Sequence, residues 1–114
     1  MTPGRYNMIC PQGATFQQTL TYLIDDVAVN LGGYTAKMQV RDGYNASNFL
    51  VGLTSSSGIV ITASAGMLDI SIAPHVTKAI KPGDYVYDLE ITSSGGIVTR
   101  LIEGKFSVTP EVTR

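Results

Sequence analysis

The chain of 114 residues is long enough for one domain around one hydrophobic core, and we expect that domain to span residues 1–114. Its formal net charge of −1 and its charged fraction of 15% argue against a protein that a basic face holds to nucleic acid. Hydrophobic residues make up 44% of the chain, which argues against disorder, yet no apolar run approaches the roughly 20 residues that would cross a bilayer.

The N-terminal segment, residues 1–7, lacks a basic region followed by an apolar one, so we expect no secretory signal there. A first short strand is expected at residues 7–11. Pro11 suits the end of that strand because proline cannot donate a hydrogen bond to a ladder. Cys10 is the only cysteine, which excludes a disulfide within the chain and favours a small buried hydrophobe over a reactive thiol.

Alternation of apolar and polar residues with a period of two predicts three further strands, because successive side chains of a strand point to opposite faces. These strands are expected at residues 15–23, 34–41 and 49–53. The adjacent Asp25 and Asp26 are interpreted as a tight turn after the first of them rather than as an acid/base pair. The apolar side chains expected to face the core are Phe16, Leu20, Tyr22, Tyr34, Ala36, Met38, Val40, Phe49, Val51 and Leu53.

A hairpin and one short helix are expected next. Residues 58–62 and 67–72 alternate on either side of a turn at residues 63–66. Residues 74–81 break the strand pattern and suit a helix, because Pro74 fits a first helical position, where its missing N–H costs nothing. We expect this helix to cap one end of the core. The core side chains expected from the hairpin are Ile59, Ile61, Leu68, Ile70 and Ile72.

The last third of the chain predicts two long strands, at residues 83–91 and 97–108, joined by the turn at residues 93–96. With a three-residue loop, Asp88 would lie opposite Arg100 on the outer face of the hairpin. A bulge near Glu103-Gly104 would then return Phe106 and Val108 to the core. Turn signals every ~8–12 residues along the chain favour a β-sandwich or a barrel.

A search for chemistry yields no catalytic residues, no cofactor site and no metal site. His75 is the only histidine, and it falls on the expected helix, where a surface position is the simpler reading. Asp84, Asp88 and Glu90 share one face of a strand, but calcium sites collect their oxygens from a loop, so a solvated or partner-facing stripe is the simpler reading. The glycine pairs lack the spacing of a dinucleotide or phosphate loop. We therefore expect a protein that is not an enzyme.

Most aromatic residues are in phase with the apolar faces and are expected in the core. Tyr6 and Tyr44 lie outside clear strands, so they are candidates for a surface contact. A carbohydrate- or receptor-binding module would need a larger cluster of exposed aromatic residues than these two.

Five segments of the chain form an ordered set, at residues 13–22, 30–41, 83–90, 98–104 and 108–114. The set, with its final Thr-Pro-Glu-Val-Thr-Arg, resembles a family of small virion-associated proteins of tailed bacteriophages. The resemblance implies an all-β, immunoglobulin-like antiparallel β-sandwich with one short helix near residues 74–81. It also implies a fold similar to the N-terminal domain of phage baseplate proteins that hold receptor-binding proteins.

On this resemblance we expect a bacteriophage structural protein that acts in the virion, assembled in the host cytoplasm, as a tail, baseplate or fibre adaptor. Its partners would be other phage structural proteins in a symmetric multicopy assembly, without nucleic acid or membrane. A capsid decoration protein is the alternative of the same class, and a receptor- or carbohydrate-binding module is the alternative of another class. The interface residues expected are Tyr6, Tyr44, Asp88, Glu90, Arg100, Pro110, Glu111 and Arg114.

Overall fold

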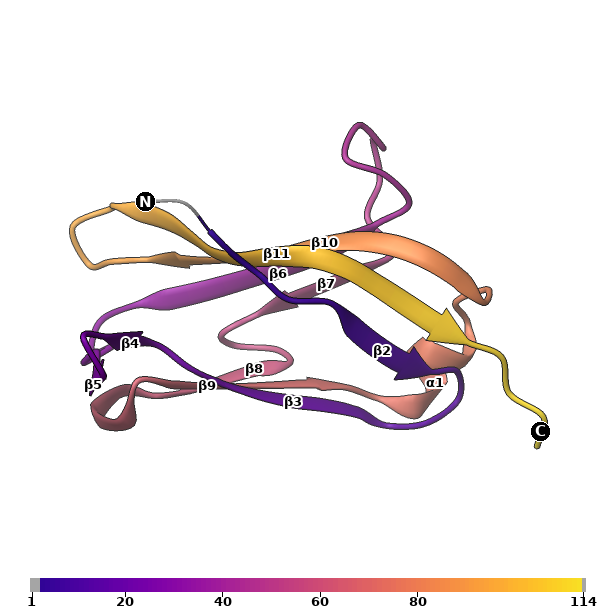
Figure 1. The fold of residues 1–114 in the computed structure, drawn as a ribbon, viewed down its shortest axis with the longest axis horizontal. Coiled ribbons are helices and arrows are strands. Elements are labelled where there is room, and N and C mark those ends of the chain that lie inside the picture. Colours follow the sequence, from indigo (N-terminus) through magenta and orange to yellow (C-terminus); the bar gives the residue numbers. More distant parts are fainter. Residues whose placement is uncertain (1–2, 114) are drawn as a thin grey trace.

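The computed structural model describes residues 3–113 and folds them into two β-sheets that face each other across a hydrophobic core (Figure 1). The larger sheet contains β1 (Gly4–Arg5), β2 (Met8–Pro11), β6 (Thr35–Arg41), β7 (Val51–Thr54), β10 (Gly83–Thr92) and β11 (Val98–Thr109). The smaller sheet contains β3 (Phe16–Thr21), β8 (Ile59–Thr62) and β9 (Met67–Ile72), and a separate hairpin pairs β4 (Leu23–Ile24) with β5 (Val27–Ala28). The predicted all-β sandwich with one short helix is confirmed.

The strand order of the larger sheet is β1-β11-β10-β6-β7, with β2 also paired to β11. β10 lies at the centre, because it pairs antiparallel with β11 on one side and with β6 on the other. β1 and β2 pair with β11 in the parallel direction, so they are the exceptions to an otherwise antiparallel sheet. The smaller sheet has the antiparallel order β3-β9-β8.

The core fills the space between the two sheets, and strand alternation decides its members. In β6, for example, Ala36, Met38 and Val40 are buried while the residues between them point outwards. Two aromatic rings from opposite sheets meet at its centre, where Phe16 and Phe106 pack edge to face with centroids 5.3 Å apart. The other buried hydrophobic residues include Met8, Cys10, Leu31, Ile59, Leu68, Ile70, Ile72, Tyr87, Leu89 and Ile91.

The register of the β10–β11 hairpin differs from the prediction. Arg100 lies opposite Glu90 instead of Asp88, and the bulge falls between Leu89 and Glu90 instead of near Glu103-Gly104. The reason is the loop, which spans residues 93–97 between the paired Thr92 and Val98 and is therefore longer than the three residues assumed. Hydrogen bonds from the N–H groups of Gly96 and Ile97 to Ser93 close this longer loop.

The helix α1 (Pro74–Lys78) is shorter than the predicted 74–81. It ends early because the N–H groups of Ala79 and Ile80 bond to the oxygens three residues before them, at 3.2 Å each, instead of continuing the α-helical pattern. Beyond this turn, Gln12 Nε2 donates to the oxygen of Ile80 at 2.9 Å. The fully buried Thr77 fixes the helix against the β2–β3 loop, since its Oγ1 lies 2.8 Å from the oxygen of Ala14 and accepts the Gly13 N–H at 3.1 Å. Within residues 3–113 no helix has the length and apolar character that spanning a membrane would need.

The expected burial of Phe49 is wrong. Its side chain is 51% exposed, because β7 begins only at Val51 and Phe49 belongs to the loop before it. The Phe49 ring lies over Gly52, where a Cβ atom would collide with it, and 6.0 Å from the Arg41 guanidinium carbon.

Candidate binding face on the larger sheet

The outer face of the larger sheet, which points away from the core, carries most of the charged side chains of the strands. Residues that alternate with the buried positions of β6, β10 and β11 point outwards here. They are Lys37, Gln39 and Arg41 of β6, Asp84, Val86, Asp88 and Glu90 of β10, and Arg100, Glu103, Lys105 and Ser107 of β11. Of the predicted interface residues, Tyr44, Asp88, Glu90 and Arg100 come together on this face.

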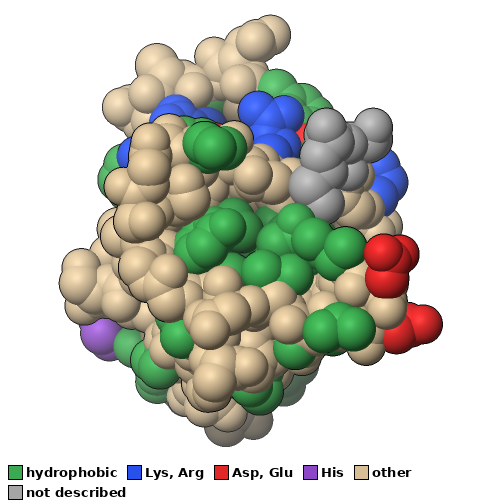
Figure 2. Space-filling view, turned by 90° about the vertical axis from the view of Figure 1, so that its left-hand side faces the viewer, with side chains coloured by type: hydrophobic (Ala, Val, Ile, Leu, Met, Phe, Trp, Pro, Cys, Tyr) green, Lys and Arg blue, Asp and Glu red, His purple; other side chains and the backbone are tan. Residues whose placement is uncertain are grey.

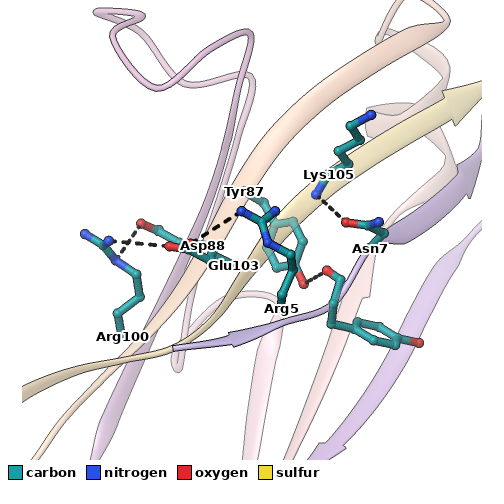
Figure 3. Close-up of polar contacts among 8 residues, drawn as sticks. Arg5, Asn7, Tyr87, Asp88, Arg100, Glu103 and Lys105 are labelled. Carbon is teal, nitrogen blue, oxygen red and sulfur yellow. Dashed lines mark hydrogen bonds and ion pairs between the residues drawn. The ribbon is translucent and has the colours of Figure 1, made fainter. Parts of the chain in front are cut away.

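A chain of ion pairs crosses the face from β10 to β1 (Figure 3). The Arg100 Nε lies 3.3 Å from the Asp88 carboxylate, and its Nη1 lies 3.5 Å from Glu103. Arg5 reaches the same Glu103 at 3.9 Å. The Arg100 side chain is 51% exposed, so each of these pairs contributes less than about 1 kcal/mol to stability.

A shallow hollow of about 170 Å³ opens beside this chain of ion pairs. It lies under the loop of residues 42–50, which rises from the sheet between β6 and β7 (Figure 1). We call it the Tyr44 hollow. Its lining residues are Gln39, Arg41, Tyr44, Val86, Tyr87, Asp88 and Glu90. Residues of a loop and of two strands that are distant in sequence therefore meet at one place.

Arg41 fixes the loop that forms the roof of the Tyr44 hollow. Its Nη1 donates to the backbone oxygen of Ala46 at 2.9 Å, and its Nη2 donates to Gln39 Oε1 at 2.8 Å. The backbone N–H of Leu50 also returns to the Val40 oxygen at 2.7 Å. These bonds tie both ends of the loop to β6, and they place Tyr44, which is 67% exposed, at the rim of the hollow.

The charged side chains of the Tyr44 hollow differ in whether they have a hydrogen-bond or ion-pair partner. Asp88 is paired with Arg100, and the Arg41 guanidinium is bound to oxygens of the loop and of Gln39. Over residues 3–113, no hydrogen bond or ion pair is found for the Glu90 carboxylate. The two guanidinium groups of Arg41 and Arg100 balance the two carboxylates, and Glu90, which lies opposite Lys37 on β6 and Arg100 on β11, is the carboxylate that can still accept a bond from a ligand.

The remaining predicted interface residues lie elsewhere. Tyr6 joins β1 to β2 and donates its hydroxyl to Gln18 Oε1 at 3.3 Å, so it connects the two sheets. Pro110 and Glu111 follow β11 at the opposite end, where the Glu111 N–H donates to Gln12 Oε1 at 3.1 Å. Arg114 lies outside the described residues.

Gln39 and Arg41 are site residues that the sequence reasoning placed only on the polar side of a strand. Their alternation with Met38 and Val40 shows that they point outwards, but it does not show what lies above them. Arg41 directly precedes Asp42-Gly43, a turn signal that starts a long loop. The sequence signal for the role of Arg41 is therefore its position directly before a long loop, whose backbone carbonyl groups an arginine side chain can bind.

The other titratable groups lie outside this face. Cys10 is buried, as expected, and burial raises the pKa of its thiol to about 11. His75 in α1 lines a groove of about 660 Å³ with Asp42 and Lys81. In the part of the chain that the structure describes, no group of three or more His, Cys, Asp or Glu side chains is placed to hold a metal ion.

No family model matches this chain, and no curated protein matches it either. Among solved structures, the crystal structure of CopC from Methylosinus trichosporium OB3b is similar to it over 100% of this chain and 90% of that one. The identity is 14% and the TM-score is 0.48. At these values no ligand or activity is transferred from CopC to this chain.

The function predicted from the sequence is corrected by the likeness to CopC, which gives the phage role no support. The predicted role as a bacteriophage tail, baseplate or fibre adaptor is wrong, and so is the virion localisation. The alternatives of a capsid decoration protein and of a receptor- or carbohydrate-binding module are dropped with it. The segments that carried the resemblance are alternating strands that many small sandwiches share, and a fold does not determine a function. The family resemblance itself stays a prediction.

Proposed function

We propose that this protein is a non-catalytic binding module for another protein, and that the partner places a lysine or arginine side chain in the Tyr44 hollow. The observation that carries this proposal is the convergence of Tyr44 from the loop with Asp88 and Glu90 from β10. An aromatic ring beside two carboxylates is the chemistry that recognises an organic cation.

The size of the hollow supports a side chain as its occupant. Sites for small molecules have volumes of roughly 300–1,000 Å³, whereas the Tyr44 hollow has about 170 Å³. A site of this size on an open sheet face suits one side chain of a larger partner, whose remaining surface would rest on the polar residues around it. Binding of this kind needs no proton transfer and no covalent step.

The charges support a cationic occupant rather than an anionic one. The Arg41 guanidinium is already bound to Ala46 and Gln39, so it offers few donors to an incoming carboxylate. The Glu90 carboxylate is open to a partner, and an ammonium or guanidinium over the exposed Tyr44 ring would gain a further ~0.5–1 kcal/mol.

Selection from a library of random twelve-residue peptides tests this proposal without a known partner. We expect the wild-type protein to enrich peptides with Lys or Arg at one fixed position. Tyr44→Ala or Glu90→Gln should weaken binding of the selected peptides about two- to five-fold, which corresponds to the ~0.5–1 kcal/mol of one exposed cation–π or ion-pair contact. Lys105→Gln is the matched control, because Lys105 lies on the same face but outside the hollow. Enrichment of acidic or purely apolar peptides, or equal binding by all three variants, would contradict the proposal.

A further inference from the structure

Two hairpin tips at one end of the sandwich expose large apolar side chains. The β4–β5 hairpin exposes Leu23, Ile24 and Val27, and the β10–β11 hairpin exposes Ile97 and Val98, with exposed fractions from 49% to 70%. Both hairpins lie at the left-hand end of Figure 1, and Figure 2 shows hydrophobic side chains gathered in a hollow at the centre of that end. We call this surface the hairpin end. Contiguous exposed apolar surface of this kind marks an interaction site.

Charges of opposite sign lie on different sides of the hairpin end. Asp25 and Asp26 form the turn between β4 and β5. On the larger sheet, Lys37 lies two residues inside the end of β6, where Thr35 pairs with Thr92. Arg100 lies equally close to the end of β11, but it is already paired with Asp88 and Glu103 of its own chain. Figure 2 shows cationic side chains along the upper border of the apolar hollow and acidic side chains at its right-hand border.

This arrangement is complementary to a second copy of itself. When two identical ends meet face to face about a two-fold axis that runs between the acidic and the cationic border, the acidic border of each copy meets the cationic border of the other. The apolar hollows then cover each other at the centre. Isologous contacts of this type are the commonest in homo-oligomers, and this one would satisfy both pairs of charges at once.

The available area agrees with a weak dimer. The two shorter dimensions of the molecule are 28 and 24 Å, so its end offers at most about 670 Å². Stable interfaces bury about 800 Å² per partner, and weak or transient ones bury less. The end surface therefore suits a dimer that forms and dissociates with concentration.

The β4–β5 turn is conformationally costly, which is a further sign that its acids have a use. Asp25 and Asp26 have φ angles of 51° and 64°, the left-handed region that two-residue hairpin turns require and that Asn-Gly fills at less cost. Over residues 3–113, no hydrogen bond or ion pair is found for either carboxylate. Both acids are therefore free to face a partner.

We infer that the hairpin end is a homotypic interface, through which two copies of this chain associate end to end. Apolar contact between Leu23, Val27 and Ile97 forms its centre, and pairing of Asp25 and Asp26 with Lys37 of the second copy forms its border. This inference is separate from the Tyr44 hollow, which lies on the outer sheet face.

Sedimentation equilibrium of the full chain from about 10 μM to 1 mM tests the inference. We expect a reversible dimer that weakens at least three-fold in 0.5 M salt, because screening shortens the range of exposed charge pairs. Ile97→Asp and Val27→Asp should each weaken it at least ten-fold while the chain stays folded by circular dichroism. Val60→Asp is the matched control, since Val60 is 63% exposed on β8, outside the hairpin end.

Charge reversal tests the pairing itself. D25K/D26K and K37E should each be largely monomeric alone, and a mixture of the two should form a heterodimer, because both charged contacts are then attractive again. Tyr44→Ala should dimerise like the wild type, which separates this interface from the proposed partner site. A chain that stays monomeric at 1 mM, a dimer that Val60→Asp disrupts and Ile97→Asp does not, or a mixture that stays monomeric would overturn the inference.

Discussion

The hydroxyl of Tyr87 donates a hydrogen bond to the backbone carbonyl oxygen of Tyr6, 81 residues earlier in the chain. Tyr87 stands in the central strand β10 with its ring edge-on to Phe106. Tyr6 lies between β1 and β2, and its N–H donates to the Glu103 oxygen at 3.0 Å. The bond therefore attaches the N-terminal strands to the middle of the core.

Loss of this bond should measurably destabilise the fold. Tyr87→Phe keeps the buried ring and removes only the hydroxyl, so the Tyr6 oxygen loses its donor and the free energy of unfolding should fall by about 1–2 kcal/mol. Tyr85→Phe is the control, because the Tyr85 hydroxyl also donates to a backbone oxygen, that of Lys81, but at an exposed position. Urea unfolding should show a smaller change for this control, and equal changes would contradict the argument.

The free energy of unfolding should decline in two steps as the pH rises into the alkaline range. Burial raises the pKa of the Cys10 thiol from 9.0 to about 11, and burial together with Tyr6 raises the pKa of Tyr87 above its usual value of 10. A raised pKa in the folded state means that the stability these groups contribute is complete below their unfolded values and is lost as the pH rises through the folded ones. The free energy of unfolding should therefore fall from about pH 9 and fall more steeply above pH 10.

Variants assign these two steps. Cys10→Ala should reduce the fall in the free energy of unfolding between pH 9 and 10, and Tyr87→Phe should reduce the fall above pH 10. Both effects concern the slope with pH and do not depend on how far each substitution lowers the stability at neutral pH. Unfolding curves at half-unit intervals of pH measure both slopes. A wild-type protein whose stability is constant from pH 8 to 11 would show that the two groups are not buried as described.

Gly104 should be intolerant of any side chain. A Cβ atom at this position of β11 would collide with the backbone oxygen of Tyr6, so Gly104→Ala must push β1 and β2 away from the sheet. We expect a loss of about 1–3 kcal/mol. Gly95→Ala is the control, since a Cβ there meets nothing closer than the Ser93 hydroxyl at 3.9 Å, and it should change stability by less than about 0.5 kcal/mol.

The contrast between Gly104 and β6 shows what the sequence can predict. The alternation of Ala36, Met38 and Val40 with polar residues predicts strand, face and burial together, because the side-chain period of a strand is two. The close approach at Gly104 depends on where β1 and β2 lie, and the two-residue β1 leaves no periodic signal. The prediction of the β10–β11 register was wrong for a similar reason. Hydrogen bonds to Ser93 set the length of the loop, and no pattern of residue types in the sequence predicts these bonds.

The same limit explains the candidate site. Exposed position and charge predicted Tyr44, Asp88, Glu90 and Arg100, and the structure brings these four to one face. Arg41 was missed because its role depends on the Ala46 carbonyl, and backbone oxygens are identical in every residue. Tyr6 was a reasonable surface candidate by sequence, but a backbone contact with Tyr87 makes it part of the framework.

The β4–β5 turn offers a last prediction, in which stability and association change in opposite directions. D25N/D26G places the preferred residues of a two-residue turn at the two positive φ angles, so the monomer should gain about 1 kcal/mol in the free energy of unfolding. The same change removes both carboxylates from the hairpin end, so the dimer should weaken and should already be dissociated at concentrations where the wild type is still dimeric. Thermal unfolding in dilute solution and sedimentation at high concentration measure the two effects separately. A variant that is more stable and dimerises as before would show that the acids do not contribute to the interface.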